Sequence, residues 1–254
     1  MADLTGRKWL SLASGLKMAV PGFVGGSHAH RLKPLVEKLR IPTVVITDID
    51  PTQETVNATT GKKSWTATAN TGDAGLKCGN STLRQWHPKL ETLDDFKTPS
   101  AGHLTWTGAP DCRVRFAWQL PVPEAGNEWP ATFEDSLILT NIEWFKELNK
   151  LMEEAKADKG KGKAKAADAD QARKIKPPTG ALAAAARAVA GAATHAELLT
   201  ALHTLMHGSF SKGDFAASIF ERVAAGADLT CPKYIADALT WLQDELDPAG
   251  GVTS

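Results

Sequence analysis

The segment at residues 42–51, PTVVITDIDP, constrains the fold more than any other part of the sequence. Its apolar run VVI is β-branched throughout and a proline closes the segment, which is typical of a strand buried in a parallel sheet. The strand nevertheless ends by presenting two carboxylates, Asp48 and Asp50. The sequence therefore predicts an α/β fold with acidic groups at the carboxyl end of a strand, where ligands gather in open α/β sheets.

The spacing of these two aspartates favours a shared cation. Residues two apart in a strand point to the same side, about 6.5 to 7 Å apart, so both carboxylates can approach one ion. An unpaired carboxylate near a sheet costs free energy or shifts its pKa, and a divalent cation removes that cost. The alternative is that Asp48 caps a following turn and Asp50 is simply solvated.

Bulk properties limit the class of protein. The 254 residues allow one large domain or two small ones, and a formal net charge of zero gives no overall basic field for nucleic acid, although a local basic groove stays open. The 3 cysteines form no C-x-x-C pair, which indicates neither a disulfide framework nor a cysteine zinc site and fits a reducing compartment. No run approaches the roughly 18 to 20 apolar residues of a membrane span. We expect a soluble, cytoplasmic protein without a membrane partner.

The first part of the chain predicts an α/β domain at residues 21–152, after an uncertain N-terminal segment, 1–20, that could form a short amphipathic helix. PGFVGGSHAH predicts a strand that ends in a glycine turn. HRLKPLVEKLRI predicts a helix with apolar residues at helical spacing: Leu32, Leu35, Val36 and Leu39. With the strand before Asp48 these elements make a βαβ unit with a right-handed crossover. Residues 52–79 are polar and predict a loop or weakly structured excursion.

Three further elements follow in the α/β domain. A helix is expected to begin near Ser81, because Asn80 and Ser81 are good N-caps. A half-exposed strand is indicated by apolar residues alternating with polar ones: Val114, Phe116 and Trp118 against Arg113, Arg115 and Gln119. TFEDSLILTNIEWFKELNKLMEEA predicts one long helix, capped by Thr132, with a core stripe of Leu137, Phe145 and Leu148.

Composition changes at residues 153–179, where alternating Lys, Ala and Gly and a closing Pro-Pro pair predict a flexible linker. The linker could touch phosphates as a basic arm, but a solvated spacer is favoured. Residues 180–254 predict a helical C-terminal part, beginning with two alanine-rich helices hinged near Gly191.

Glu134 and Asp135 form a further acidic site at the start of the long helix. A nuclease that uses divalent ions needs carboxylates from separate elements, since each ion takes oxygen ligands and keeps positions open for phosphate and water. On spacing alone, the simpler explanation is that Glu134 stabilises the helix dipole, by about 0.3 to 1 kcal/mol.

Four ordered blocks resemble the C-terminal nuclease region of the OLD (overcoming lysogenization defect) family, which is built around a TOPRIM domain: TVVITDIDP, CGNSTLRQWHP, TFEDSLILTN and SKGDFAASIFE. The preceding GGSHAHRLKPLVEKLRIP is similar to the family's helix into the D-x-D strand. The similarity runs over about residues 21–225, interrupted by the linker. D-x-D alone is a weak signal, and four blocks in order are a much more specific one.

The resemblance implies a TOPRIM fold, a Rossmann-like parallel sheet flanked by helices, with Mg²⁺ or Mn²⁺ as cofactor and nicking or cleavage of DNA as activity. Asp48 and Asp50 match the D-x-D metal ligands, Glu134 matches the acidic position that completes the metal site, and Asp135 stands beside it as a helper. Lys212 in SKGDFA matches an active-site lysine, whose point charge could neutralise the scissile phosphate. The implied partners are DNA and an ATPase domain or subunit, and a homo-oligomer is left open.

Two parts of the family's pattern do not occur in this sequence. The E-G-x-x-E motif of the first TOPRIM strand is missing, since Asp3 is the only carboxylate in the first twenty residues, and GKKS at residues 61–64 is not a P-loop. We therefore expect either the nuclease half of an ATPase-nuclease or a catalytically incomplete TOPRIM remnant that binds DNA or serves in assembly. A topoisomerase or primase is disfavoured, because Tyr234 is the sole tyrosine, on a helix at the far end, and no zinc-binding segment occurs.

Overall fold

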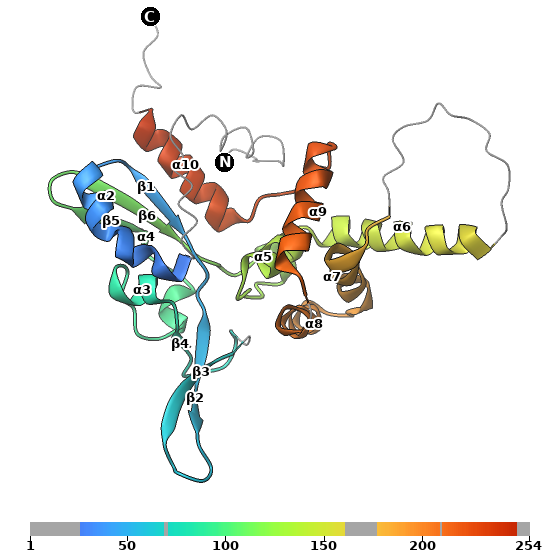
Figure 1. Ribbon diagram of the computed structural model, residues 1–254, viewed down its shortest axis with the longest axis horizontal. Coiled ribbons are helices and arrows are strands. Elements are labelled where there is room, and N and C mark those ends of the chain that lie inside the picture. Colours follow the sequence, from blue (N-terminus) through green and yellow to red (C-terminus); the bar gives the residue numbers. More distant parts are fainter. Residues whose placement is uncertain (1–25, 69–70, 161–176, 209, 248–254) are drawn as a thin grey trace, which may run out of the picture. The chain divides into compact units, whose positions relative to one another are not determined.

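The computed structural model of the chain describes residues 26–68, 71–160, 177–208 and 210–247 (Figure 1). They belong to two compact units. One includes the chain up to Thr140 and again from Thr230, and the other is Asn141–Leu229. The architecture is mixed α/β, as the sequence predicts, with all strands of the described residues in the first unit. No helix in the described ranges is both long and apolar enough to cross a membrane.

The first unit contains two small sheets with helices around them. Its strands are β1 (Thr43–Ile46), β2 (Pro51–Val56), β3 (Lys63–Ala67), β4 (Lys77–Cys78), β5 (Thr105–Gly108) and β6 (Cys112–Ala117). Its α-helices are α2 (Lys33–Leu39), α3 (Ser81–Gln85), α4 (Ala101–Leu104), α5 (Phe133–Thr140) and α10 (Lys233–Leu246), and its 3-10 helices are η1 (Gly26–Leu32), η2 (Asp94–Phe96) and η3 (Pro123–Ala125). The strand orders are β1-β6-β5 and β3-β2-β4.

The β1-β6-β5 sheet confirms the strand predicted before the two aspartates. β1 runs parallel to β6, with Val45 opposite Phe116. β5 and β6 are antiparallel, so the sheet is mixed and the prediction of a parallel sheet holds only for the β1-β6 pair. The reason is the short connection at residues 109–111, because a parallel pair needs a crossover of a dozen or more residues.

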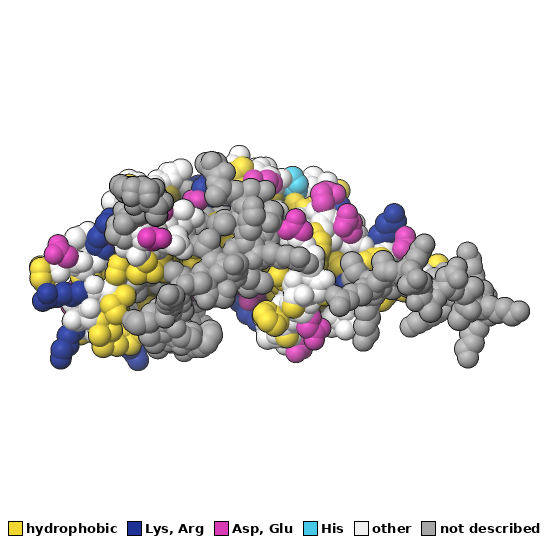
Figure 2. All heavy atoms as spheres, turned by 90° about the horizontal axis from the view of Figure 1, so that it is seen from above, with side chains coloured by type: hydrophobic (Ala, Val, Ile, Leu, Met, Phe, Trp, Pro, Cys, Tyr) yellow, Lys and Arg dark blue, Asp and Glu magenta, His cyan; other side chains and the backbone are white. Residues whose placement is uncertain are grey.

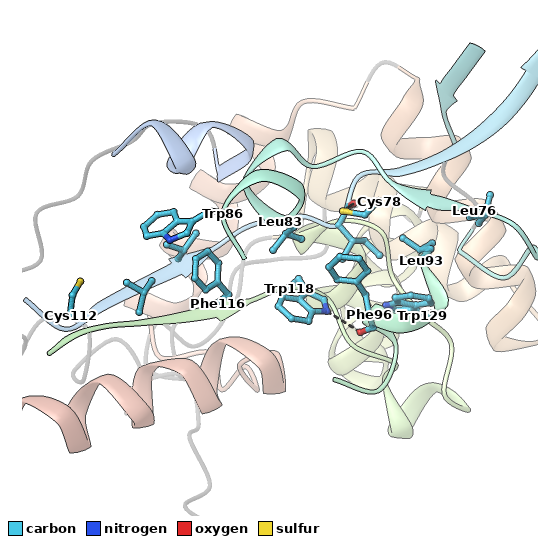
Figure 3. Packing of buried hydrophobic residues seen from close by; sticks show 13 residues of the cluster. Leu76, Cys78, Leu83, Trp86, Leu93, Phe96, Cys112, Phe116, Trp118 and Trp129 are labelled. Carbon is cyan, nitrogen blue, oxygen red and sulfur yellow. Dashed lines mark hydrogen bonds between the residues drawn. The ribbon is translucent and has the colours of Figure 1, made fainter. Parts of the chain in front are cut away.

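One face of β6 carries the core of the first unit (Figure 3). Phe116 and Trp118 have no exposed surface, and each meets another aromatic ring edge-on. The ring centroids of Trp86 and Phe116 lie 5.1 Å apart, and those of Phe96 and Trp118 lie 5.3 Å apart. The indole N–H of Trp118 donates to the backbone carbonyl of Phe96 at 3.0 Å. Edge-to-face aromatic pairs of this kind add about 0.5 to 1.5 kcal/mol to the burial itself, so the cluster holds β6 firmly in place.

The other face of β6 is partly covered by α10, so the prediction of a half-exposed strand holds only at its start: Arg113 is exposed and Arg115 is half-buried, whereas Ala117 is buried. Arg113 is ion-paired with Glu245 at 2.5 Å and its guanidinium lies 5.8 Å from the ring centroid of Trp241. Ala117 packs on the same face in a buried cluster with Tyr234. Arginine has an apolar stem and a charged head, so it can lie under the edge of a helix and still reach water. Alternating Arg residues therefore do not distinguish a solvated face from a covered one.

Residues 52–79, predicted to be a loop, include an antiparallel hairpin. β2 and β3 pair from Thr52 opposite Ala67 to Val56 opposite Lys63. In the connecting turn the side-chain oxygen of Asn57 accepts backbone N–H bonds from the two residues that follow Ala58. We call this hairpin, residues 51–67, the arm. It was missed because exposure on both faces leaves no apolar alternation to read.

Helix α2 confirms the helix predicted before β1, but not its core face. Val36 packs against the core cluster, whereas Leu35 and Leu39 are 51% and 53% exposed. The predicted strand within PGFVGG and the helix predicted at residues 1–20 lie outside the described residues. The βαβ unit is therefore confirmed only from its helix onward.

The long helix predicted after Thr132 is divided in two. α5 ends at Thr140 and α6 (Ile142–Gly160) begins after Asn141, which lies at the boundary between the two units. The predicted stripe is buried as expected: Leu137, Phe145 and Leu148.

The second unit consists of α6 with α7 (Gly180–Gly191), α8 (His195–His207) and α9 (Lys212–Ala224). The hinge predicted near Gly191 is confirmed, since α7 ends there. Part of the predicted linker at 153–179 is helical, because α6 continues to Gly160, and residues 161–176 lie outside the described residues. The compact units thus cut the chain near residues 140 and 230, whereas composition suggests cuts around the linker.

Candidate functional site

The candidate site begins where β1 ends. The parallel ladder continues one bond past Ile46, through the backbone N–H of Thr47 and the carbonyl of Ala117 at 3.0 Å. Beyond it, Asp48 is half-buried, Ile49 has no exposed surface, and Asp50 is exposed. The buried isoleucine anchors the segment in the core, so the carboxylates on either side of it are held at the surface of the unit.

Asn80 is the residue that holds this segment from the side of α3. Its side-chain nitrogen donates to Thr47 Oγ1 at 2.9 Å, to the Asp48 carbonyl at 2.8 Å and to Asp50 Oδ2 at 2.9 Å. Its side-chain oxygen accepts the N–H groups of Thr82 and Leu83 and so caps α3. The amide therefore ties the acidic segment to a helix N-terminus, and the cap predicted from the sequence is confirmed.

Gln119 holds the same segment from the end of β6. It is fully buried, and its side-chain oxygen accepts the backbone N–H of Ile49 at 3.0 Å. Its side-chain nitrogen donates to the Asp48 carboxylate and, at 3.5 Å, reaches the hydroxyl oxygen of Tyr234. A buried amide with both ends bonded has one orientation, so it fixes the position of the Asp48 carboxylate.

Tyr234 is distant in sequence but adjacent to the site. Burial, and then the nearby charge of Asp48, raise the pKa of this phenol. The hydroxyl therefore keeps its proton at neutral pH, and a phenolate nucleophile is not available from it. The sequence gives no sign of this placement, since it depends on α10 packing against β6.

The backbone at Asp50 is in an uncommon conformation that depends on Gly79. Asp50 has φ of 46°, in the left-handed region that non-glycine residues seldom adopt. Its carbonyl accepts the backbone N–H of Gly79 at 2.6 Å. A Cβ on Gly79 would lie 2.7 Å from that carbonyl oxygen and 2.7 Å from Thr52 Cγ2. The close approach therefore requires glycine at position 79, the middle residue of the CGN sequence at residues 78–80.

Cys78, beside this glycine, is not a reactive thiol. It is buried, its Sγ donates to the Ile49 carbonyl at 3.0 Å, and burial raises its pKa to about 12. The thiol therefore serves as a buried packing group that steadies the segment between the two aspartates.

Glu134 and Asp135 lie in the first turn of α5, as predicted. Thr132 Oγ1 accepts the backbone N–H of Asp135 at 3.2 Å, and the Asp135 carboxylate accepts the N–H of Thr132 at 3.2 Å, a capping-box arrangement. Asp135 has no exposed surface, and burial raises its pKa to about 6 despite these bonds and with a contribution from the charge of Glu134. Glu134 is 9% exposed. The capping box accounts for Asp135, whereas its two hydrogen bonds do not involve the Glu134 carboxylate.

The predicted site residues thus fall on three elements. Asp48 and Asp50 share one segment after β1, Glu134 and Asp135 share the start of α5, and both places belong to the first unit. Lys212 belongs to the second unit, where it is the first residue of α9 and follows the capping Ser211. Over the described ranges, no three His, Cys, Asp or Glu side chains are grouped so as to hold a metal ion. The described residues thus do not bring Asp48, Asp50 and Glu134 together as a three-ligand group, and their joint role in metal binding stays a prediction.

The chemistry of Asp48 and Asp50 fits a hard divalent cation. Mg²⁺ takes oxygen ligands and is usually bound through one or two carboxylates. An ionised carboxylate has about four lone-pair positions, so it can bind a metal ion while it also accepts hydrogen bonds. Outer partners that orient such ligands are themselves a feature of metal sites, and Asn80 and Gln119 are placed to act in this way.

The sequence did not predict that Gln119 belongs to this site, and for Asn80 it predicted the helix cap but not the hydrogen bonds to the acidic segment. Gln119 was predicted as a solvent-facing strand residue, and the one available signal was an amide at the end of an apolar strand. Asn80 was predicted as a cap, and its three donor bonds could not be read from the sequence because their acceptors lie 30 or more residues away.

Comparison with known proteins adds no relative to this description. No family model matches the chain, and neither a curated protein nor a solved structure matches it.

Proposed function

We propose that the chain is a metal-dependent DNA endonuclease of the OLD/TOPRIM type, which hydrolyses phosphodiester bonds and could form the nuclease half of an ATPase-nuclease. The observation that carries the proposal is the Asp48/Asp50 segment. Two carboxylates follow a strand parallel to its neighbour, and two buried amides hold them from different elements. Such support would keep both carboxylates in place for a metal ion.

In this proposal Asp48 and Asp50 hold Mg²⁺ or Mn²⁺ together with Glu134. The ion would supply Lewis-acid stabilisation of charge on the phosphate and a lowered pKa for a bound water. Gln119 keeps the Asp48 carboxylate oriented, and Tyr234, being protonated, adds no competing negative charge. For Lys212, in the second unit, the family resemblance alone implies a point charge for the phosphate. Asp135, with its pKa near 6, supports the fold of α5 and the position of Glu134.

A catalytically incomplete TOPRIM remnant, acting as a DNA-binding or assembly module, is the second candidate. The observation in its favour is that the described residues contain no three-ligand group. The two candidates share the fold and the DNA partner, and they differ in whether a divalent cation binds.

Nicking of supercoiled plasmid with Mg²⁺ or Mn²⁺ tests the endonuclease. We expect open-circle product from the chain, and its loss in Asp48→Asn and in Lys212→Ala. Asp244→Asn removes an exposed carboxylate from α10 and serves as the matched control, which should cut like the parent chain. Intact plasmid with both metals, at protein concentrations where DNA is bound, would remove the catalytic proposal.

Titration calorimetry with Mn²⁺ then separates the two candidates. Heat that disappears in Asp48→Asn supports a metal-dependent enzyme. No heat, combined with retained DNA binding, supports the remnant.

A further inference from the structure

The arm takes no part in either core of the first unit. Every residue from 56 to 67 is exposed, on both faces of the ribbon. In Figure 1 the hairpin of β2 and β3 extends away from the β1-β6-β5 sheet. β4 pairs with β2 only at Pro51 and Thr52, so beyond these residues the arm is a two-stranded ribbon. Such a ribbon is marginally stable in water, because it buries little apolar surface. A polar ribbon of this kind gains most from a partner that covers it.

We propose that the arm binds double-stranded DNA and directs it to the Asp48/Asp50 segment, an inference that rests on the proposed function. The arm begins at Pro51, directly after Asp50, so DNA lying along β2 passes the carboxylates. The major groove of B-DNA, about 12 Å wide, admits a two-stranded β-ribbon. With 6 residues in β2, the ribbon is about 20 Å long at roughly 3.3 Å per residue.

One face of the arm carries cations around an exposed indole. Directly opposed residues of an antiparallel pair share a face, and the register puts Glu54 opposite Trp65. Lys77 of β4 lies on this face too, with its ammonium 4.6 Å from the centroid of the Trp65 ring. The ring is 43% exposed, so it holds Lys77 along the ribbon while leaving part of its own surface open to a ligand.

The arm carries two lysines, Lys62 and Lys63 at its turn end, against one acid, so its charge balance is positive. Lys77 of β4 adds a further cation beside the base of the arm. The one acid of the hairpin, Glu54, is ion-paired with Lys63 at 2.7 Å in an exposed setting, where such a pair is worth about 0 to 1 kcal/mol. A phosphate can therefore replace Glu54 as the partner of Lys63 at little cost.

The opposite face of the arm is lined by short hydrogen-bonding side chains: Gln53, Thr55, Ser64 and Thr66. Thr55 Oγ1 and Ser64 Oγ lie 3.0 Å apart and bridge the two strands. Hydroxyl and amide groups bond both phosphate oxygens and base edges. This face suits polar contact along a groove better than an apolar protein surface.

The chain as a whole has no basic field that would attract DNA. The formal net charge is zero, and on the face displayed in Figure 2 acidic and basic side chains are interspersed among the described residues. A chain without an overall basic field depends on a local group of lysines for the sequence-independent part of its affinity for DNA.

The test measures fluorescence anisotropy of a labelled 30-base-pair duplex with the full chain in EDTA, so that no metal-dependent cleavage occurs. The arm variant is Lys62→Ala/Lys63→Ala/Lys77→Ala. The control, Lys146→Ala/Lys156→Ala/Lys233→Ala, removes the same charge from three exposed lysines that are ion-paired within their own helices. Circular dichroism confirms that both fold, since none of the six side chains is buried.

We expect the arm variant to bind duplex at least tenfold more weakly than the parent chain at about 0.1 M salt. The slope of the logarithm of the binding constant against the logarithm of the salt concentration should decrease in magnitude by about 2 to 3, because each lysine–phosphate contact contributes about one unit. The control should change affinity less than about twofold, the scale of a remote charge effect. Equal loss in both variants, unchanged binding by the arm variant, or preference for single strands over duplex overturns the proposal. Loss of plasmid nicking with arm-dependent binding intact would instead count against the proposed endonuclease alone.

Discussion

Replacing Asp135 by asparagine should stabilise the protein at neutral pH. The carboxyl group is fully buried, and its pKa is raised from 3.8 to about 6. A shift of about two units, at 1.36 kcal/mol per unit, means that the ionised form costs the folded state roughly 3 kcal/mol at pH 7 relative to the protonated form. Asparagine is neutral at every pH, and its amide oxygen can still accept the N–H of Thr132.

The sign of the pH dependence follows from the direction of this shift. Because the folded-state pKa lies above the unfolded one, the folded protein binds more protons, and stability falls as pH rises from about 3.8 to 6. The difference in the free energy of unfolding between Asp135→Asn and the parent chain should therefore be largest above pH 7. It should disappear as the pH falls below 4.

Urea unfolding followed by tryptophan fluorescence measures this gap. At pH 7.5 we expect Asp135→Asn to unfold at a higher urea concentration than the parent chain, with the slope m unchanged. The shift should correspond to an increase of about 2 to 3 kcal/mol in the free energy of unfolding. Asp244→Asn, on the exposed side of α10, should stay within about 0.5 kcal/mol at both pH values. A variant less stable than the parent at pH 7.5, or a gap that does not change with pH, would refute the reasoning.

Divalent cations extend the same experiment to the proposed function. If the acidic residues of the first unit hold a cation, Mg²⁺ at a hundredfold over its Kd stabilises the folded parent chain by about 2.7 kcal/mol. The advantage of Asp135→Asn over the parent should then persist with Mg²⁺ if Asp135 only supports α5. It should shrink if Asp135 itself contributes charge to the ion.

Three more substitutions test the site's support. Gly79→Ala should destabilise by more than 1 kcal/mol and reduce nicking, since its Cβ would meet backbone at 2.7 Å, whereas Gly213→Ala, with open space around it, should be neutral or slightly stabilising in thermal unfolding. Asn80→Ala should cost about 2 to 4 kcal/mol in urea unfolding, because a helix cap and three donor bonds are lost together. Arg113→Ala should cost less than about 1 kcal/mol, and less still in high salt, as its side chain is 47% exposed.

The strand before Asp48 and the cap at Asn80 could be predicted because both depend on neighbouring residues alone. A β-branched apolar run before a turn, and an asparagine just before a helix, carry their own local reasons. The first-turn acids of α5 belong to the same class, and the structure places them at residues 134 and 135 as expected.

What could not be predicted depends on contacts between distant segments. Gln119 and Tyr234 are 115 residues apart and meet only because α10 covers β6. The arm was not predicted for a different reason. A strand is recognised in a sequence by the apolar residues of its one buried face, and the two strands of the arm have no such face. Its Thr-rich composition is compatible with β structure, but polar segments of that length are equally typical of loops.

The conformation of Asp50 connects the site and the arm. A non-glycine residue in the left-handed region is strained, by about 1 to 3 kcal/mol in sparsely populated regions, and persists only where the surroundings determine it. Here Gly79 bonds its carbonyl and Asn80 bonds its carboxylate, so the bend is fixed from two sides. The next residue is the first of the arm. A junction held this firmly gives the arm a fixed direction relative to the carboxylates. DNA bound along the arm would therefore present its backbone to Asp48 and Asp50 in one register, which a flexible connection could not ensure.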